Sequence, residues 1–254
     1  VTMSTEAALD EYYLALRQGQ KEYRELMMAG KEPHPAVLDE ILPEQSTETV
    51  LSIGLVDIPA ERIVGTKSAG RITAFTASFR PLLEAKSEFG TKWILLCEAH
   101  LGDTGITDPI ECYEYLGNFY VQEGNKRVSV MRHFDAPRIP GNVKRVLPPR
   151  NEEDPRIKAY YEFLDFYKVS KLYSVQFRRP GDYARLLSAM GKRSDEIWSD
   201  DDRRIFNSYY HYFLEAFQSL NAQDGVLPEE ALLLWLKLYP FQDLGRLSGA
   251  ELKK

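Results

Sequence analysis

The sequence has few of the residues that build covalent cross-links or metal centres. It holds two cysteines, Cys97 and Cys112, and four histidines among its 254 residues. Two cysteines make no disulfide framework, and their spacing is not that of a zinc site. Each stands in an apolar pattern, where cysteine usually behaves as a small buried hydrophobic group. We therefore expect two buried thiols.

The sequence also lacks any long hydrophobic run. No apolar stretch approaches the about eighteen uninterrupted residues typical of a transmembrane helix. The opening VTMSTEAALDEYY has no basic region followed by an apolar one, so it does not look like a secretory signal. These absences predict a cytoplasmic protein that does not insert into a membrane.

Positive charge is in deficit over the whole chain but not everywhere along it. The 32 lysine and arginine residues are outnumbered by 38 acids, which gives a net charge of -6. This balance argues against a nucleic-acid-binding protein, whose surface normally carries excess positive charge. Residues 121–150 are the exception, with seven basic residues against two acidic ones. One basic region in an acidic chain favours a small anionic ligand over a long polyanion.

The apolar spacing predicts an α+β fold in three parts. Helical spacing over residues 5–29 and again after Pro35 predicts an N-terminal helical hairpin within residues 1–48. Residues 49–150 mix strand and helix patterns, and we expect a small mixed sheet with helices there. Residues 151–254 have a mostly helical pattern.

Some elements can be placed individually. We expect a helix over residues 78–100 and a β-hairpin over residues 110–122 that turns at the Gly-Asn pair 117–118. After Gly124 the apolar spacing becomes helical. The segment LYSVQF, residues 172–177, favours one more strand.

The segment EGNKR, residues 123–127, has the make-up of a phosphate cradle. Gly124 lets the backbone turn and approach a ligand, and the amides after it face outward at a positive helix N-terminus. Lys126 and Arg127 add charge, and the arginine fork suits phosphate oxygens. Because cations at a helix N-terminus oppose the helix dipole, their presence there favours a bound anion. The alternative is a solvated turn balanced by Glu123.

An earlier loop supplies further candidates. The segment GTKSAGR carries Thr66, Lys67, Ser68 and Arg71, although not in the order of a P-loop. Loops on one side of a sheet often converge on a ligand, so this loop is a candidate second wall; otherwise it is a surface loop without function. Glu123 is the candidate ligand for Mg²⁺ beside the phosphates, or else a charge that balances a neighbouring lysine.

Four short motifs follow one another in an informative order. They are Gly105-Ile106, Pro109-Ile110, Gly124-Asn125-Lys126-Arg127 and Ile139-Pro140. This set, within residues 55–147, resembles the N-terminal domain of the ParB/sulfiredoxin-like superfamily. The resemblance implies a box that contacts nucleotide phosphates, CTP in ParB proteins and ATP in sulfiredoxins and a serine kinase branch. By that likeness the four residues of the box hold the phosphates of CTP or ATP, with Mg²⁺, and Arg71 is a second anion contact.

The sequence departs from the family pattern. Sulfiredoxins carry a nucleophilic cysteine inside the box, where this chain has Asn125, so the likeness does not extend to thiol chemistry. The later Glu/His/Arg box of ParB proteins cannot be placed in residues 151–254, which argues against CTP hydrolysis. A helix-turn-helix there would begin its recognition helix with Asp195 and Glu196, which DNA phosphates repel.

The whole chain has a second likeness. Its segments MSTEAALDEYYLALRQGQKEYRE, GTKSAGR and YYEFLDFYKV are similar to the N-terminal region of some bacterial multidomain proteins. In those proteins a domain of the basic membrane protein family, which binds purine nucleosides, follows. The likeness implies a cytosolic sensor or coupling module of a longer protein.

Together these patterns predict a nucleotide- or phosphate-binding regulatory domain. Two alternatives stay open. One is a nucleotide-dependent phosphotransferase or NTPase with Glu123 as the base. The other is a protein–protein or DNA-associated module without nucleotide, in which tyrosine-rich helices form the interface of a homodimer.

Overall fold

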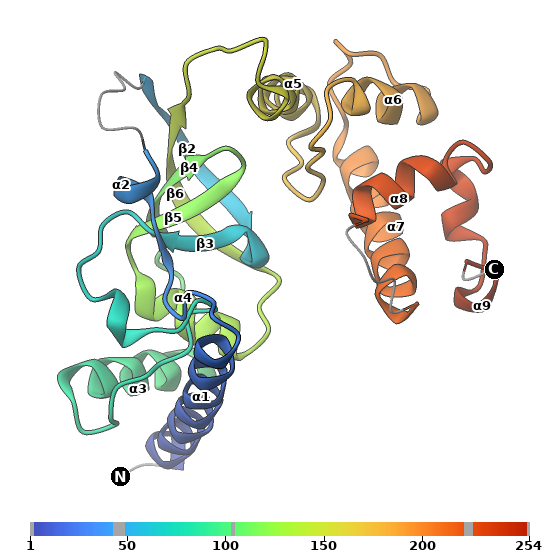
Figure 1. Cartoon of the computed structure of the whole chain (residues 1–254). Coiled ribbons are helices and arrows are strands. Elements are labelled where there is room, and N and C mark those ends of the chain that lie inside the picture. Colours follow the sequence, from blue (N-terminus) through green and yellow to red (C-terminus); the bar gives the residue numbers. More distant parts are fainter. Residues whose placement is uncertain (1–2, 43–48, 103–104, 221–225, 253–254) are drawn as a thin grey trace. The chain divides into compact units, whose positions relative to one another are not determined.

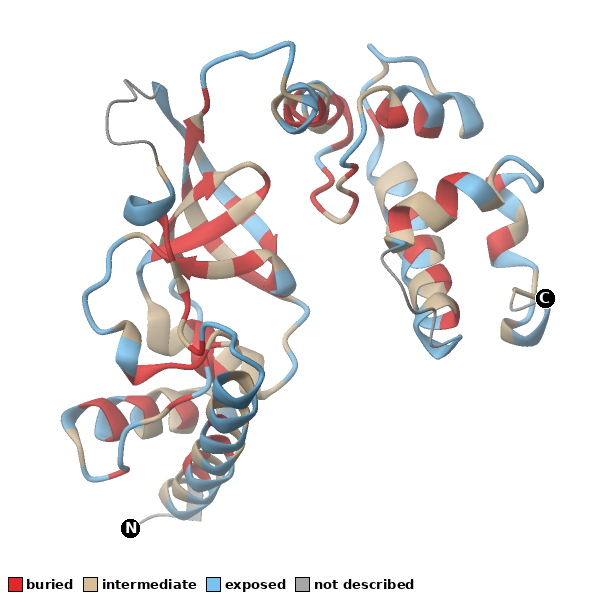
Figure 2. Ribbon diagram, viewed as in Figure 1, coloured by how far each residue is buried: buried red, intermediate tan, exposed pale blue. Residues whose placement is uncertain are grey.

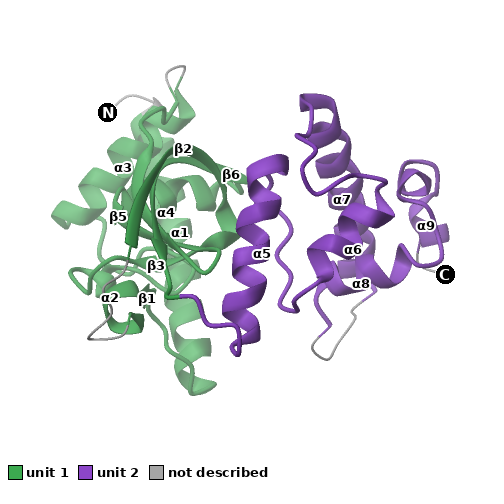
Figure 3. Ribbon diagram, turned by 90° about the horizontal axis from the view of Figure 1, so that it is seen from above, with its two compact units in different colours: residues 1–149 green, residues 150–254 purple. Residues whose placement is uncertain are grey.

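The computed structural model describes residues 3–42, 49–102, 105–220 and 226–252. The chain divides into two compact units, residues 1–149 and residues 150–254 (Figure 3). The predicted α+β class is confirmed, because the first unit combines a mixed sheet with helices and the second is helical. None of the described helices has both the length and the hydrophobicity needed to cross a lipid bilayer.

The first unit contains the sheet (Figure 1). Its strands are β1 (Ala36–Val37), β2 (Thr49–Pro59), β3 (Ile63–Thr66), β4 (Ile110–Tyr115), β5 (Asn118–Glu123) and β6 (Arg138–Leu147). Its helical elements are α1 (Met3–Met28), α2 (Leu38–Ile41), α3 (Glu88–Leu101), α4 (Asn125–His133) and the 3-10 turns η1 (Ala60–Arg62) and η2 (Ile72–Ala74). The strands are ordered β1-β3-β5-β4-β6-β2.

The sheet is mixed in direction. β3 runs parallel to β1 and to β5, and β4 runs parallel to β6, while the β4–β5 and β2–β6 pairs are antiparallel. The predicted β4–β5 hairpin is present. Its two turn residues are Leu116 and Gly117, with φ of 49° and 81°, because Tyr115 and Asn118 already pair as strand residues. The turn therefore lies one residue earlier than the Gly-Asn pair.

Three helices pack around one tryptophan. Trp93 of α3 is fully buried, its ring centroid lies 5.2 Å from that of Tyr12 on α1, and its indole N–H donates to Ser129 Oγ on α4 at 2.8 Å. Figure 1 shows these helices grouped to one side of the strands. Figure 2 shows buried residues running along the strands and the inner sides of the helices. This packing holds α3 beside α4, and the starts of both helices contribute residues to the site.

The second half of the predicted N-terminal hairpin contains a short strand as well as a short helix. α1 forms as expected, and Gly30 follows it with a left-handed φ of 65°. The segment after Pro35 forms β1 before the single turn of α2, because Val37 pairs in parallel with Thr66. Residues 1–42 therefore belong to the same compact unit as the sheet and are not a separate hairpin domain.

The helix predicted over residues 78–100 begins only at Glu88. Phe79 adopts a left-handed φ of 67°, and the Glu22 carboxylate on α1 accepts a hydrogen bond from the Ser78 amide at 3.1 Å. These contacts hold the preceding segment in a turn. Ser87 then caps α3 by accepting from the Gly90 amide at 3.0 Å.

The second unit is helical. Its elements are α5 (Pro155–Ser170), α6 (Asp182–Ala189), α7 (Asp200–Ser219), α8 (Pro228–Trp235), η3 (Phe241–Gly245) and α9 (Gly249–Leu252). The strand predicted over residues 172–177 is absent from the described part of this unit. The Tyr183 hydroxyl instead accepts from the Phe177 amide at 3.2 Å and donates to the Val175 carbonyl at 3.4 Å. A side chain thus satisfies groups that a neighbouring strand would otherwise pair.

Both cysteines are buried free thiols, as expected. Burial raises the pKa of Cys97 and of Cys112 to about 12. Neither thiol is therefore a ready nucleophile, since it is the thiolate that reacts.

Candidate functional site: a cationic edge of the sheet

Two loops meet because two neighbouring strands run parallel. β3 and β5 pair in parallel, with Thr66 opposite Val121, so the segments that follow them leave the sheet at the same edge. The Lys67 amide donates to the Val121 carbonyl at 2.9 Å and extends this pairing into the loop. The loop after β3 and the start of α4 are thus neighbours, as the convergence of the two predicted walls requires.

Gly124 forms the junction between β5 and α4. It has φ 105° and ψ 18°, in the left-handed region that side chains disfavour. A Cβ placed on it would lie 2.7 Å from Cγ2 of Ile110, which is itself buried on β4. Only glycine fits this turn without strain or collision. The prediction that a glycine is needed to turn the backbone here therefore has a geometric basis.

The N-terminus of α4 is open. No side chain of the described residues caps it, and the Val128 amide donates to the Gly124 carbonyl at 3.0 Å as its opening hydrogen bond. The amides of the three residues before Val128 therefore lie at the positive end of the helix. Among the described residues, no donor lies within hydrogen-bond distance of the buried Asn125 Oδ1. A buried polar atom without a partner is uncommon in folded proteins.

Three cations from separate segments act on the charge of one carboxylate, Glu88. Lys92 Nζ donates to Glu88 on the first turn of α3 at 2.7 Å. This hydrogen bond, and then the charges of Lys92, Arg71 and Lys126, hold the pKa of Glu88 below its usual value. We call Arg71, Glu88, Lys92 and Lys126 the edge cluster. It joins the loop after β3, the start of α3 and the start of α4.

This arrangement disfavours the charged form of Lys126. Burial lowers its pKa, and the charges of Arg71 and Lys92 lower it further against the opposing effect of Glu88. Its Nζ lies 5.1 Å from the centroid of the Phe89 ring, a cation–π contact that holds it at the start of α3. The ammonium is thus kept close to like charges.

Arg127, predicted as a phosphate contact, is hydrogen-bonded to the backbone before β4. Its Nη1 donates to the carbonyls of Pro109 at 2.6 Å and Asp108 at 3.0 Å, and only 18% of its side chain is exposed. These bonds fix the chain where it enters β4. Glu123, with 75% of its side chain exposed, lies 4.0 Å from Nη2 of Arg127. In this geometry Arg127 positions the turn, while Lys126 and Arg71 are the cations of the edge.

The other loop candidates are occupied elsewhere. Thr66 is buried, and its hydroxyl donates to the Ser68 carbonyl at 2.9 Å. Lys67 is paired with Asp39 and lies 5.3 Å from the ring of Tyr113. Ser68 is exposed. Of the predicted second wall, the structure brings only Arg71 into the edge cluster.

The residues do not form a metal centre by themselves. Over the described ranges, no group of three or more histidine, cysteine, aspartate or glutamate side chains could hold a metal ion. Glu123 offers a single carboxylate that already faces Arg127. Mg²⁺ in nucleotide sites is held by one or two carboxylates together with the phosphates, so only a bound nucleotide would complete a site here.

Sequence reasoning missed Lys92 and Glu88. Their spacing of four residues indicates an exposed helical ion pair, which is a common feature with no functional meaning of its own. Their place beside Lys126 depends on the packing of α3 against α4, which no local pattern contains.

Comparison with protein-family models, with curated proteins and with solved structures finds no match to this chain. The likeness to the ParB/sulfiredoxin-like superfamily therefore stays a prediction from the residue pattern.

Proposed function

We propose that the first unit binds the phosphates of a nucleotide at the edge cluster. The observation that carries the proposal is that Arg71, Lys92 and Lys126 together lower the pKa of Glu88, while Lys126 stands at an uncapped helix N-terminus. Phosphate oxygens suit both features, because they accept hydrogen bonds from helix amides and pair with lysine and arginine. In a chain with a net charge of -6, this edge is a local reversal of sign.

The charge balance of the cluster supports a multiply charged ligand. One carboxylate, Glu88, offsets three cations, which leaves a surplus of two positive charges. The lowered pKa of Lys126 is the mark of that surplus, after the effect of burial. An anion placed among the three cations would reverse the repulsion and raise the pKa of Lys126.

The proposal assigns the phosphates of the nucleotide to Lys126, Arg71, Lys92 and the first amides of α4. Phosphate oxygens only accept hydrogen bonds, which suits these donors.

The regulatory role is part of the same proposal. The edge cluster contains no general base paired with a nucleophile, since Glu88 is held by Lys92 and Glu123 lies beside Arg127. Binding without turnover suits a sensor module of a longer protein.

Calorimetry of the full chain with CTP, ATP, GTP and their diphosphates, with and without Mg²⁺, tests the proposal. We expect saturable binding by at least one nucleotide, weakened about tenfold or more by Lys126→Gln, because a hydrogen bond to a charged group contributes about 1.5–3 kcal/mol. Lys144→Gln on β6 is the matched control, since it removes the same charge from the same unit. Absence of binding at millimolar nucleotide, or equal loss in both variants, would contradict the proposal.

The same mixtures of protein and nucleotide distinguish a binding module from an enzyme. Nucleotide that stays intact over a long incubation supports a binding module. Phosphate release that Glu123→Gln abolishes would instead assign the site to an NTPase or phosphotransferase.

A further inference from the structure

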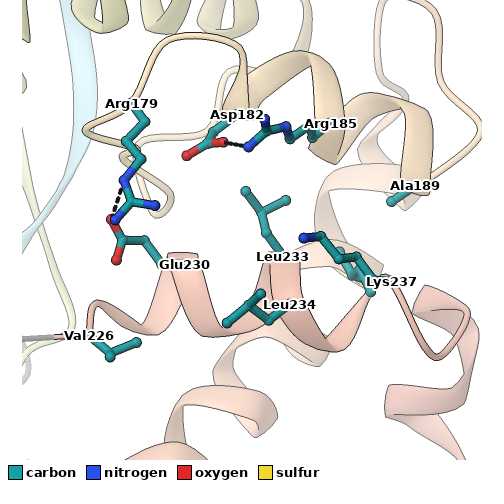
Figure 4. Close-up of a pocket in the computed structure, with 10 residues that line it drawn as sticks. Arg179, Asp182, Arg185, Ala189, Val226, Glu230, Leu233, Leu234 and Lys237 are labelled. Carbon is teal, nitrogen blue, oxygen red and sulfur yellow. Dashed lines mark hydrogen bonds and ion pairs between the residues drawn. The ribbon is translucent and has the colours of Figure 1, made fainter. Parts of the chain in front are cut away.

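The second unit contains a pocket between α6 and α8 (Figure 4). Its volume is about 470 Å³. Known small-molecule sites span roughly 300–1,000 Å³ and combine an apolar lining with a few polar groups. This pocket belongs to a different unit from the edge cluster, so its argument is independent of the proposed nucleotide site.

Helix periodicity explains which side chains line it. Asp182, Arg185 and Ala189 lie on one face of α6 at spacings of three and four residues, and all three line the pocket. On the opposite wall Glu230, Leu233 and Leu234 lie on α8 at spacings of three and four residues, and Lys237 lies in the turn that follows the helix. Since α6 packs against α8, the two faces enclose one space.

The lining is aliphatic. Leu233, Leu234, Leu236 and Val226 supply most of the apolar surface, and none of the lining residues is aromatic. Leu234 is 57% exposed and Val226 is 47% exposed, so apolar surface remains open at the pocket. A ligand that covers these side chains gains about 25 cal/mol for each Å² of apolar area removed from water. Without an aromatic platform the pocket is unsuited to stacking a nucleotide base.

Five charged side chains line the pocket, and four of them form ion pairs with one another. Asp182, whose side chain is only 4% exposed, accepts from Arg185 Nη1 at 2.8 Å, and Glu230 pairs with Arg179 at 3.6 Å. Within the described residues, Lys237 has no acidic partner. Figure 4 shows its amino group directed toward Leu233, over the aliphatic lining. The pocket therefore joins an aliphatic lining to a single unbalanced ammonium.

We propose that this pocket binds an aliphatic monocarboxylate, with the carboxylate on Lys237 and the chain over Leu233 and Leu234. One surplus cation matches one negative charge, and a charge-assisted hydrogen bond fixes the end of the chain. The Arg179–Glu230 pair links the segment before α6 to α8, the Asp182–Arg185 pair lies within α6, and neither uses Lys237.

Calorimetry with sodium decanoate, kept below its micellar concentration, tests this site in the full chain. We expect saturable binding with one decanoate per chain. Lys237→Gln should weaken it about tenfold or more, and Ala189→Phe, at an exposed position of α6, should abolish it by filling the space. Lys168→Gln on α5, an exposed lysine paired with Asp165, should leave binding unchanged.

Decylammonium is the ligand control. Decylammonium has a similar aliphatic chain but a positively charged end group. It should bind at least tenfold more weakly than decanoate, because its ammonium would be repelled by Lys237. No saturable binding of decanoate, equal binding of both ligands, or binding that neither Lys237→Gln nor Ala189→Phe changes would overturn the proposal.

Discussion

Replacing Gly124 with alanine tests whether the turn into α4 is built for glycine. The new Cβ would be held at φ 105° and would lie 2.7 Å from Cγ2 of Ile110. A side chain in a disfavoured φ region costs about 1–3 kcal/mol, and overpacking a buried site costs about 1–3 kcal/mol more. Because Ile110 is buried and branched at Cβ, it has little freedom to move aside. We therefore expect Gly124→Ala to lower the free energy of unfolding by about 2–6 kcal/mol.

Two other glycines separate the causes. Gly54 has φ 78° but open space around it, so Gly54→Ala carries the backbone strain alone and should cost about 1–2 kcal/mol. Gly70 has neither feature, so Gly70→Ala should stay within about 0.5 kcal/mol. At about 2–4 °C per kcal/mol, the melting temperature of the Gly124→Ala variant should fall by roughly 4–24 °C. Thermal melts followed by circular dichroism measure all three, and equal losses for Gly124→Ala and Gly54→Ala would refute the role of Ile110.

Three further outcomes are expected. Burial and neighbouring cations place the folded pKa of Lys126 below 10.5, so Lys126→Met should stabilise the fold by about 0.5 kcal/mol at neutral pH. That gain should fade as the pH approaches 10.5, and a gain that persists in alkaline melts would contradict it. Glu114→Gln should lower the free energy of unfolding in urea by about 3 kcal/mol, because it leaves the buried guanidinium of Arg145 without its carboxylate. A decrease of less than about 1 kcal/mol would show that the fold does not depend on this pair. Hydrogen bonds from Ser199 and then Lys192 lower the pKa of Asp202 to about 2, so the stability that Asp202 gives α7 is complete above pH 3.8 and lost as the pH falls through about 2. In acid titrations Ser199→Ala should cost about 1 kcal/mol and weaken this dependence, and an unchanged profile would argue against the capping box.

The elements that the sequence predicted correctly depend on local chemistry. The change from strand to helix at Gly124 follows from a glycine and a change of apolar spacing within a few residues. The helix expected over residues 5–29 follows from apolar residues at helical spacing within one segment, and α1 spans Met3–Met28. Neither prediction required knowledge of a distant partner.

The errors arise where distant residues decide the outcome. The turn before α3 is held by Glu22, which is 56 residues away from Ser78 in the sequence. The segment at residues 172–177 has an alternating pattern, yet Tyr183 satisfies its backbone and no strand lies beside it among the described residues. A local pattern cannot show which partner will be present.

The site residues divide in the same way into those that local chemistry predicts and those that depend on distant contacts. Arg71 and Lys126 could be paired in advance, because each follows a strand and parallel neighbours bring such loops together. The inward turn of Arg127 could not be anticipated, since it depends on two carbonyls that lie before β4. Lys92 joins through the packing of α3 alone.

The most direct test of the nucleotide proposal is to locate the bound nucleotide on the chain. Backbone amide resonances of the isotope-labelled protein, followed by nuclear magnetic resonance during titration with the tightest-binding nucleotide, report which amides change their environment. We predict the largest shifts at Asn125, Lys126 and Arg127, with smaller ones next to Arg71 and Lys92. Shifts confined to residues 150–254, or unchanged resonances at the start of α4 when nucleotide is saturating, would contradict the proposal.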